Sequence, residues 1–247
     1  MKLKGKVAII TGAGRGMGRA IAGGYAREGA SLVLTAAREQ KELDEAAEAL
    51  NALGVLTDVS KEEDVEKVVQ AALQRYGRID ILVNNAGRGM KYVSPGFMVE
   101  PTRFWEIDPK TWRMIIDTNV TGVFLMTRAV VPHMLKQGWG RVINVSMNYE
   151  TMKRKGFSPY GPSKAALESM SIIWAQDLEG TGITVNRILP GGATETGMIP
   201  EGTPEKIRRN LLRPEIMVPP AVYLASNESD GVTGQRIVAL EWNRQSE

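Results

Sequence analysis

Short runs of β-branched and aliphatic residues alternate along the chain with longer stretches in which apolar residues recur at helical spacing. Seven of the short runs predict strands, at Val7–Ile10, Leu32–Thr35, Val55–Thr57, Ile79–Val83, Arg141–Val145, Thr184–Leu189 and Arg236–Leu240. Six of the longer stretches predict helices, at Gly16–Glu28, Glu39–Leu53, Lys61–Tyr76, Pro109–Lys136, Pro159–Glu179 and Pro214–Ala225. This alternation predicts an α/β fold, with a seven-stranded, mostly parallel sheet and helices on both faces.

We expect one domain over residues 1–247, because no linker, repeat or low-complexity tract interrupts the alternation. Two long segments, 88–108 and 191–213, follow predicted strands and are rich in Gly, Pro and aromatic residues. Ligands of open α/β sheets bind outside the carboxyl ends of the strands, so these segments are candidate walls of a substrate site. The alternatives are surface elaboration or a contact between subunits.

The composition excludes several classes of chemistry. The chain has no cysteine and a single histidine, His133, which excludes disulfides, thiolate catalysis and metal sites built from cysteines or several histidines. The net charge of +3 is spread along the chain and forms no dense basic stripe, so we expect no nucleic-acid partner. No signal segment or membrane-spanning run is evident, and we expect a cytoplasmic protein without membrane contact.

A glycine cluster, Thr11-Gly12-Ala13-Gly14-Arg15-Gly16-Met17-Gly18, lies between the first predicted strand and the first predicted helix. Glycines at this turn let backbone N–H groups approach a pyrophosphate at the helix N-terminus. The cluster therefore predicts a dinucleotide site. The end of the second strand, Thr35-Ala36-Ala37-Arg38, lacks the carboxylate that would bind the ribose hydroxyls of NAD. Because Arg15 and Arg38 could bracket a 2′-phosphate, NADP(H) is favoured over NAD(H).

Tyr160 and Lys164 are four residues apart at the start of a predicted helix, which places them on one face, one turn from each other. A phenol with a pKa near 10 is a poor acid or base at neutral pH, and a neighbouring ammonium lowers that pKa. The pair is thus a candidate for proton transfer.

Six motifs now stand in order along the chain: Thr11–Gly18, Asp58-Val59, Asn84–Gly87, Asn119, Tyr160–Lys164 and Pro190-Gly191. This set resembles the classical short-chain dehydrogenase/reductase family, and the resemblance runs nearly end to end, from residue 4 to residue 235. It implies a Rossmann-type fold and a nicotinamide-dependent oxidoreductase. Cofactor contacts are implied for Gly12, Arg15, Gly16, Met17, Gly18, Arg38, Asp58, Val59, Asn85, Ala86, Gly87, Tyr160, Lys164, Pro190 and Gly191.

The resemblance also implies a role for each catalytic residue. Tyr160 would give a proton to the substrate oxygen while hydride adds to its carbon, or take one in oxidation. Lys164 would bind the nicotinamide ribose and lower the pKa of Tyr160. Asn119 would hold a water molecule that relays protons to Lys164, and Asp58 and Val59 would line the adenine pocket.

One position departs from the family pattern. The serine that usually stands thirteen residues before the tyrosine, and hydrogen-bonds the substrate carbonyl, is replaced here by Met147. A thioether cannot donate a hydrogen bond. Three possibilities stay open: Ser146 takes the role, which we slightly favour; Asn148 takes it; or the donor is absent.

The leading hypothesis is a reductase or dehydrogenase acting on a ketone, an aldehyde or a secondary alcohol with apolar substituents. Reduction of a C=N or C=C bond is the enzymatic alternative, and a non-catalytic NADP-binding regulator is the alternative of another class. The resemblance suggests a homotetramer or dimer packed through the helices 109–136 and 159–179. The apolar substrate is inferred from Met90, Tyr92, Phe97, Met98, Phe104, Trp105, Met198 and Ile199.

Overall fold

The computed structural model describes residues 1–245 and contains one sheet of seven strands, in the order β3-β2-β1-β4-β5-β6-β7. Every pair of neighbouring strands is parallel, as the sequence pattern predicts. The strands are β1 (Val7–Ile10), β2 (Ser31–Ala36), β3 (Leu53–Leu56), β4 (Ile81–Asn84), β5 (Gly140–Val145), β6 (Ile183–Leu189) and β7 (Arg236–Val238).

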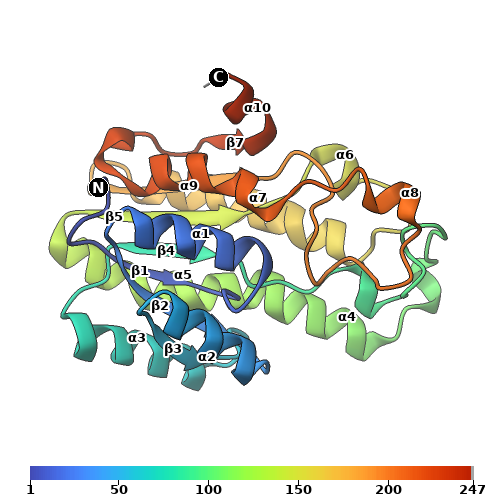
Figure 1. Cartoon of the computed structure of the whole chain (residues 1–247), viewed down its shortest axis with the longest axis horizontal. Coiled ribbons are helices and arrows are strands. Elements are labelled where there is room, and N and C mark those ends of the chain that lie inside the picture. Colours follow the sequence, from blue (N-terminus) through green and yellow to red (C-terminus); the bar gives the residue numbers. More distant parts are fainter. Residues whose placement is uncertain (246–247) are drawn as a thin grey trace.

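Helices cover both faces of the sheet (Figure 1). One face packs against α1 (Gly16–Arg27), α2 (Gln40–Ala49) and α9 (Val218–Ala225). The other packs against α3 (Glu62–Tyr76), α5 (Gly122–Gln137) and α7 (Tyr160–Asp177). The remaining helical segments are η1 (Met90–Tyr92), η2 (Phe104–Glu106), α4 (Pro109–Ile116), η3 (Asp117–Thr121), α6 (Tyr149–Met152), α8 (Glu205–Arg208), η4 (Pro214–Met217), η5 (Asn227–Ser229) and α10 (Ala239–Gln245).

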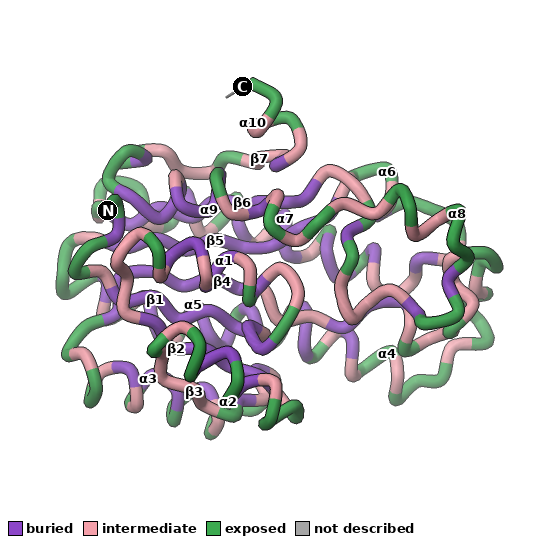
Figure 2. The backbone as a smooth tube through the Cα atoms, viewed as in Figure 1, coloured by how far each residue is buried: buried purple, intermediate pink, exposed green. Residues whose placement is uncertain are grey.

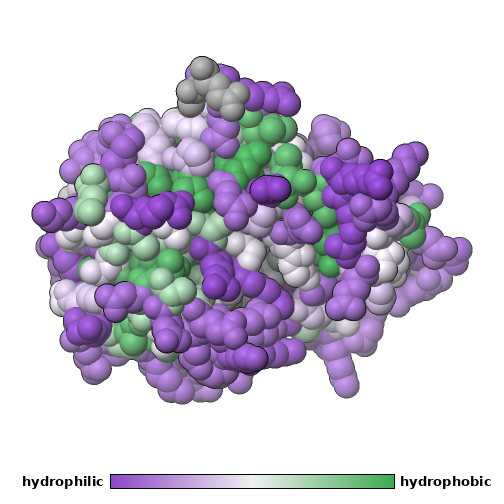
Figure 3. All heavy atoms as spheres, viewed as in Figure 1, coloured by the Kyte–Doolittle hydropathy of each residue, from purple (hydrophilic) through white to green (hydrophobic). Residues whose placement is uncertain are grey.

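The central strands β1 and β4 are buried at every position, and all their residues except Asn84 are apolar (Figure 2). Successive residues of β1 point into the hydrophobic cores on opposite faces of the sheet. Ile10 lies in the core with α1, α2 and α9, whereas Ile9 lies in the core with α3 and α5. Hydrophilic residues dominate the lower edge of the molecule, where α2 and α3 lie, and apolar residues show mainly in the upper part (Figure 3).

Several predicted boundaries differ from the observed ones by two residues or more, and three of these differences have a clear local cause. The last strand ends at Val238 instead of Leu240, because the chain turns into α10 and the Leu240 N–H bonds the Pro190 carbonyl, 3.1 Å away. The helix predicted to reach Leu53 ends at Ala49, before the left-handed residue Asn51. The helix predicted from Pro214 divides into η4 and α9, whose first turn contains prolines, which lack an N–H group.

The long predicted helix contains an irregular turn. From Pro109 to Gln137 it runs through α4, a π-helical segment η3, and α5. By length and composition alone this stretch could cross a membrane, but half of its apolar window is buried inside the fold. It packs against α3, α7 and the strands β4 and β5, so it is a helix of the core. The π-helical turn contains Asn119, and such turns occur frequently at functional sites.

A ladder of buried polar side chains crosses the middle of the sheet. The Asn84 amide on β4 donates to Thr127 Oγ1 on α5, at 3.1 Å, and to Asn144 Oδ1 on β5, at 2.8 Å. Asn144 in turn donates to Ser171 Oγ on α7, at 2.8 Å. The ladder therefore ties two helices to the two central strands, because each buried polar group needs its partner.

We expect Asn144→Ala to lower the free energy of unfolding by about 2–4 kcal/mol, because it removes two buried hydrogen bonds and opens a cavity. Urea denaturation measures this change. The control is Asn210→Ala at an exposed position, which should stay within about 0.5 kcal/mol of the wild type. Equal midpoints for the two variants would show that the ladder contributes little.

Candidate active site

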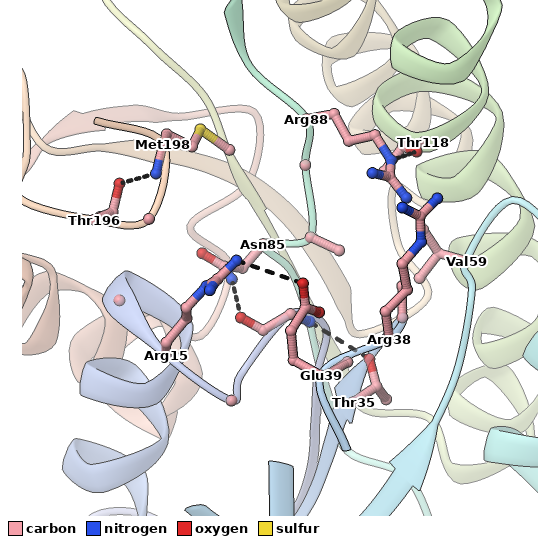
Figure 4. A pocket seen from close by; sticks show the side chains of 18 of the residues that line it. Arg15, Thr35, Arg38, Glu39, Val59, Asn85, Arg88, Thr118, Thr196 and Met198 are labelled. Atoms are coloured by element: carbon pink, nitrogen blue, oxygen red, sulfur yellow. Dashed lines mark hydrogen bonds and ion pairs between the residues drawn. The ribbon is translucent and has the colours of Figure 1, made fainter. Parts of the chain in front are cut away.

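A pocket opens at the carboxyl ends of β1 to β4, at the point where the strand order reverses between β1 and β4 (Figure 4). Ten of the residues predicted to contact a cofactor line it: Gly12, Arg15, Gly16, Met17, Arg38, Asp58, Val59, Asn85, Ala86 and Gly87. Five others do not line it: Gly18, Tyr160, Lys164, Pro190 and Gly191. The structure thus brings most of the predicted cofactor residues together around one cavity.

The glycine turn is shaped by close approaches that exclude side chains. Gly12 has a φ of 64°, and a Cβ there would lie 2.9 Å from the Ala86 Cα. A Cβ at Gly18 would lie 2.5 Å from both Asn85 Nδ2 and the Gly12 carbonyl oxygen. No side chain caps the N-terminus of α1, and its first turn carries no acidic residue. These features fit a pyrophosphate, which helix N-terminal N–H groups bind.

The end of β4 is tied to the end of β1 by Asn85 and Thr11. The Asn85 amide donates to the carbonyl oxygens of Thr11, at 2.9 Å, and Gly12, at 3.0 Å. The Thr11 hydroxyl oxygen accepts from the backbone N–H groups of Asn85 and Ala86, both at 3.0 Å. The pocket floor is therefore fixed by hydrogen bonds between two strands that are far apart in the sequence.

The two arginines predicted to bracket a phosphate lie in different environments. Arg15 is paired with Glu42, at 3.1 Å, and with Glu39, at 3.6 Å. The Arg38 side chain makes no hydrogen bond or ion pair with any residue from 1 to 245. Arg38 is thus available to an anionic ligand, whereas the charge of Arg15 is already compensated.

Tyr160 is the first residue of α7, and Lys164 follows one turn later. The Lys164 ammonium is buried, donates to the Val145 carbonyl oxygen at 2.7 Å, and lies 5.9 Å from the centre of the Tyr160 ring. Burial lowers the pKa of Lys164 to about 8, although the charge of Glu168 opposes that shift. Burial also raises the pKa of Tyr160 to about 12. Desolvation thus dominates the Tyr160 pKa in this structure, and the lowering of that pKa by Lys164 stays a prediction.

Asn119 is fully buried in the π-helical segment η3. Its amide donates to the Arg88 carbonyl oxygen and to Ser163 Oγ, each at 3.0 Å, and its Oδ1 accepts from the Arg88 N–H at 2.8 Å. Asn119 therefore joins the chain beyond β4 to the first turn of α7. Its role in a water relay to Lys164 stays a prediction.

The Ser146 hydroxyl points into a charged cluster. It donates to Glu168, which also accepts from Arg187, at 2.9 Å, and from Arg236, at 3.1 Å. Arg236 also donates to the Met147 carbonyl oxygen, at 2.9 Å, which fixes the backbone of this turn. Because a hydroxyl has one proton to donate, Ser146 is not available to a substrate oxygen in this arrangement.

Met147, which occupies the position of the usual serine, lies among apolar side chains. Met147 belongs to a buried cluster that includes Met90, Met152 and Phe157, against which Tyr160 packs. The Asn148 amide donates to the Gly191 carbonyl oxygen at 3.1 Å. The single Ser146 proton is therefore engaged elsewhere, and one of the two Asn148 amide N–H groups is bonded to Gly191.

The two long segments contribute residues that sequence reasoning did not assign to the cofactor pocket. Segment 88–108 adds Arg88, Lys91 and Tyr92 to its wall, and segment 191–213 adds Thr196, Gly197 and Met198. Proximity to the carboxyl end of a strand was the only signal for them. Phe104 and Trp105 pack edge to face, with ring centres 5.1 Å apart, and are mainly exposed. These two aromatics do not line the pocket.

Comparison with known proteins agrees with this geometry. The chain matches the family model for short chain dehydrogenase over residues 6–206. It is 36% identical to a 3-oxoacyl-[acyl-carrier-protein] reductase of Thermotoga maritima, over 96% of this chain and 97% of that protein. It is 32% identical to glucose 1-dehydrogenase 2 of Bacillus subtilis, over 94% of this chain and 92% of that protein.

The fold is also found among solved structures. The structure of a 3-ketoacyl-(acyl-carrier-protein) reductase from Brucella melitensis, complexed with NADH, matches with a TM-score of 0.84 and 32% identity. The match covers 95% of this chain and 96% of that one. The family model, the relatives and the Rossmann-type sheet thus agree. The chain belongs to the short-chain dehydrogenase/reductase family of nicotinamide-dependent oxidoreductases.

Proposed function

We propose that this protein transfers a hydride between NADP(H) and a ketone, an aldehyde or a secondary alcohol. The observation that carries the proposal is the placement of Tyr160 and Lys164 on one face of α7, with Lys164 held on the carboxyl end of β5. One relative is named a 3-oxoacyl reductase and another a glucose dehydrogenase. Both names fit a reaction between a carbonyl and a hydroxyl group.

The bound nicotinamide ring would supply or accept the hydride. In reduction, Tyr160 gives its hydroxyl proton to the substrate oxygen, and a pKa of about 12 keeps that proton in place at neutral pH. Lys164, with a pKa of about 8, is mainly charged at neutral pH and stabilises the phenolate that forms. One of its three N–H groups holds the Val145 carbonyl, which leaves two for the ribose hydroxyls.

The preference for NADP(H) rests on charge at the end of β2. No carboxylate stands at positions 35–38, and the next acidic residue, Glu39, is paired with Arg15. Arg38 lines the pocket with its charge uncompensated. A 2′-phosphate could accept hydrogen bonds from the unpaired Arg38 guanidinium. The end of β2 has no unpaired carboxylate that could accept hydrogen bonds from the ribose hydroxyls of NAD(H).

A second candidate is the reduction of a C=N or C=C bond, and the replacement of the usual serine by Met147 favours it. Ser146 donates its proton to Glu168 and Asn148 donates one N–H to Gly191, and the methionine and phenylalanine side chains against which Tyr160 packs donate no strong hydrogen bond. A carbonyl oxygen that gains negative charge needs several donors, whereas a carbon–carbon or carbon–nitrogen bond in apolar surroundings needs fewer. In either reaction the apolar walls suit a substrate with apolar substituents.

We also propose a cytoplasmic homo-oligomer, a tetramer or a dimer. Large apolar side chains on the helical stretch 109–137 and on α7 are exposed in the single chain: Trp112, Phe124, Ile172 and Ile173, each between 40 and 51% exposed. Exposed apolar residues that gather on neighbouring helices are typical of surfaces buried between subunits.

We expect Gly18→Ala to weaken NADPH binding at least ~10-fold, equivalent to about 1.4 kcal/mol, because its Cβ would displace Asn85 from the pocket floor. Quenching of protein fluorescence measures the affinity. The control is Gly23→Ala on the same helix, where a Cβ would lie 3.5 Å from Nη1 at the far end of the flexible Arg27 side chain. Equal affinities for the two variants would contradict the assignment of the pyrophosphate to this turn.

We expect Tyr160→Phe to reduce turnover by ~10²–10⁴-fold, with NADPH binding retained, because it removes only the proton donor. Loss of absorbance of the reduced nicotinamide, followed with a panel of ketones, measures this. Tyr76→Phe is the control, since its hydroxyl donates to the Leu32 carbonyl oxygen on β2, at 3.3 Å, and Tyr76 does not line the pocket. Turnover by Tyr160→Phe at the wild-type rate would exclude the proposed chemistry.

Met147→Ser separates the two candidate reactions. If the protein reduces C=N or C=C bonds, the wild type is slow with ketones, and the new hydroxyl should speed their reduction by up to ~10²–10³-fold. If ketones are the natural substrates, the wild type already turns them over and the variant gains nothing. Met152→Ser, in the same cluster but not at the serine position, is the matched control. The measurement is kcat/KM for matched ketones, imines and enones.

A further inference from the structure

Glu168 is a buried glutamate on α7, one turn beyond Lys164, and its carboxylate takes no direct part in the proposed reaction. Only 5% of its surface is exposed. Its two oxygens accept four hydrogen bonds from side chains outside α7. The donors are Ser146 Oγ, the Tyr149 hydroxyl at 3.4 Å, Arg187 at 2.9 Å and Arg236 at 3.1 Å. The carboxylate is therefore held in one place from several sides.

Glu168 and Lys164 contact consecutive residues of the same turn. Lys164 donates to the Val145 carbonyl oxygen at 2.7 Å, and Glu168 accepts the hydrogen bond of Ser146, the next residue. Residues four apart on a helix lie on the same face, so both side chains extend from α7 toward the end of β5. The fold thus fixes a negative charge beside the ammonium group of Lys164.

The charge of Glu168 acts on Lys164. Burial lowers the pKa of Lys164 to about 8, and the negative charge of Glu168 opposes that shift. Among residues 1–245, the other charged or titratable side chains that face these two groups are Tyr160 on α7, Tyr149 on α6, Arg187 on β6 and Arg236 on β7. Two guanidinium groups and one ammonium group therefore share a single carboxylate.

We propose that Glu168 is a positioning residue for the reaction: its carboxylate, fixed by Ser146 and two arginines, is the counter-charge that keeps Lys164 in its ammonium form. This inference rests on the proposed function, in which a charged Lys164 stabilises the phenolate of Tyr160. Glu168 does not line the cofactor pocket, so it acts through Lys164. Burying such a charge cluster is costly, and apolar side chains of similar volume are often equally stable, which makes the charge a candidate for a functional role.

An NMR titration of the side-chain nitrogens in isotope-labelled lysine tests the counter-charge without cofactor. The Lys164 signal is identified by its loss in Lys164→Met. We expect Glu168→Gln to lower the pH at which Lys164 loses its proton, because the negative charge beside it is gone. We expect Arg236→Gln to raise that pH, because a competing positive charge is gone while the carboxylate stays. A general loss of structure would not move one lysine in two opposite directions.

The pH dependence of ketone reduction gives the functional readout. Reduction uses the charged form of Lys164, so activity falls as the pH rises through its pKa of about 8. At about pH 8, Glu168→Gln should reduce kcat/KM by about 3- to 20-fold. At about pH 6 the reduction should be less than about 3-fold, because Lys164 is charged in both proteins and the amide oxygen can still accept from Ser146. Arg236→Gln should move the fall in activity to higher pH.

Two variants protect the interpretation. Asp177→Asn removes a negative charge from an exposed position at the end of the same helix, and Lys164 should titrate in it as in the wild type. If Glu168→Gln does not fold, Arg236→Gln, at a partly exposed position, tests the same counter-charge through the opposite shift.

The outcomes separate this inference from the proposed function. Opposite shifts of the Lys164 titration, with pH profiles that follow them, support the role of Glu168. If the Lys164 titration stays at the wild-type pH in both variants, or if activity falls by the same factor at every pH, Glu168 is a structural residue only and the inference is overturned. If the Lys164 titration shifts but the wild type reduces no ketone, imine or enone, the proposed function fails while the counter-charge stands.

Discussion

The side-by-side pairing of β1 and β4 is the constraint on which the cofactor pocket depends. The strand order reverses at this pair, since β2 and β3 lie on one side and β5 to β7 on the other. The loops beyond the two strands therefore diverge and leave a crevice. Thr11 and Asn85 bond the two strand ends, and the glycine turn approaches Ala86 so closely that a side chain at Gly12 would not fit. This close packing fixes the glycine turn, so that the backbone N–H groups at the N-terminus of α1 face the pocket.

Burial controls the pKa values of the proposed catalytic pair, Tyr160 and Lys164. Lys164 is buried and Tyr160 is partly buried, and desolvation favours the neutral form of each side chain. Lys164 keeps contact with the Val145 carbonyl, and Glu168 one turn later favours its charged form. The same Glu168 holds Ser146 and two arginines, so one buried carboxylate links the tyrosine helix to strands β6 and β7.

The sulfur-rich surroundings of Tyr160 distinguish this protein from the pattern it otherwise follows. Met147 replaces a hydrogen-bond donor with a thioether, and Met90, Met152 and Phe157 continue the apolar surface. Arg236 fixes the Met147 carbonyl through a charge-assisted bond, so the turn is rigid although its side chain is apolar. The substitution is thus accommodated by the fold, and it changes which substrate groups can be stabilised there.

The order and type of the main elements, the glycine turn and the Tyr160–Lys164 pair can all be predicted from local sequence, because each depends on spacing within a few residues. The tertiary structure decided the π-helical turn at Asn119, the helix that replaces the end of the last strand, and the orientation of Ser146 toward Glu168. It also decided that Arg15 is paired with carboxylates while Arg38 is not. Each of these features depends on contacts between charged or hydrogen-bonding groups that are far apart in the sequence. The local sequence pattern does not specify such contacts, because they form only when the strands and loops pack together.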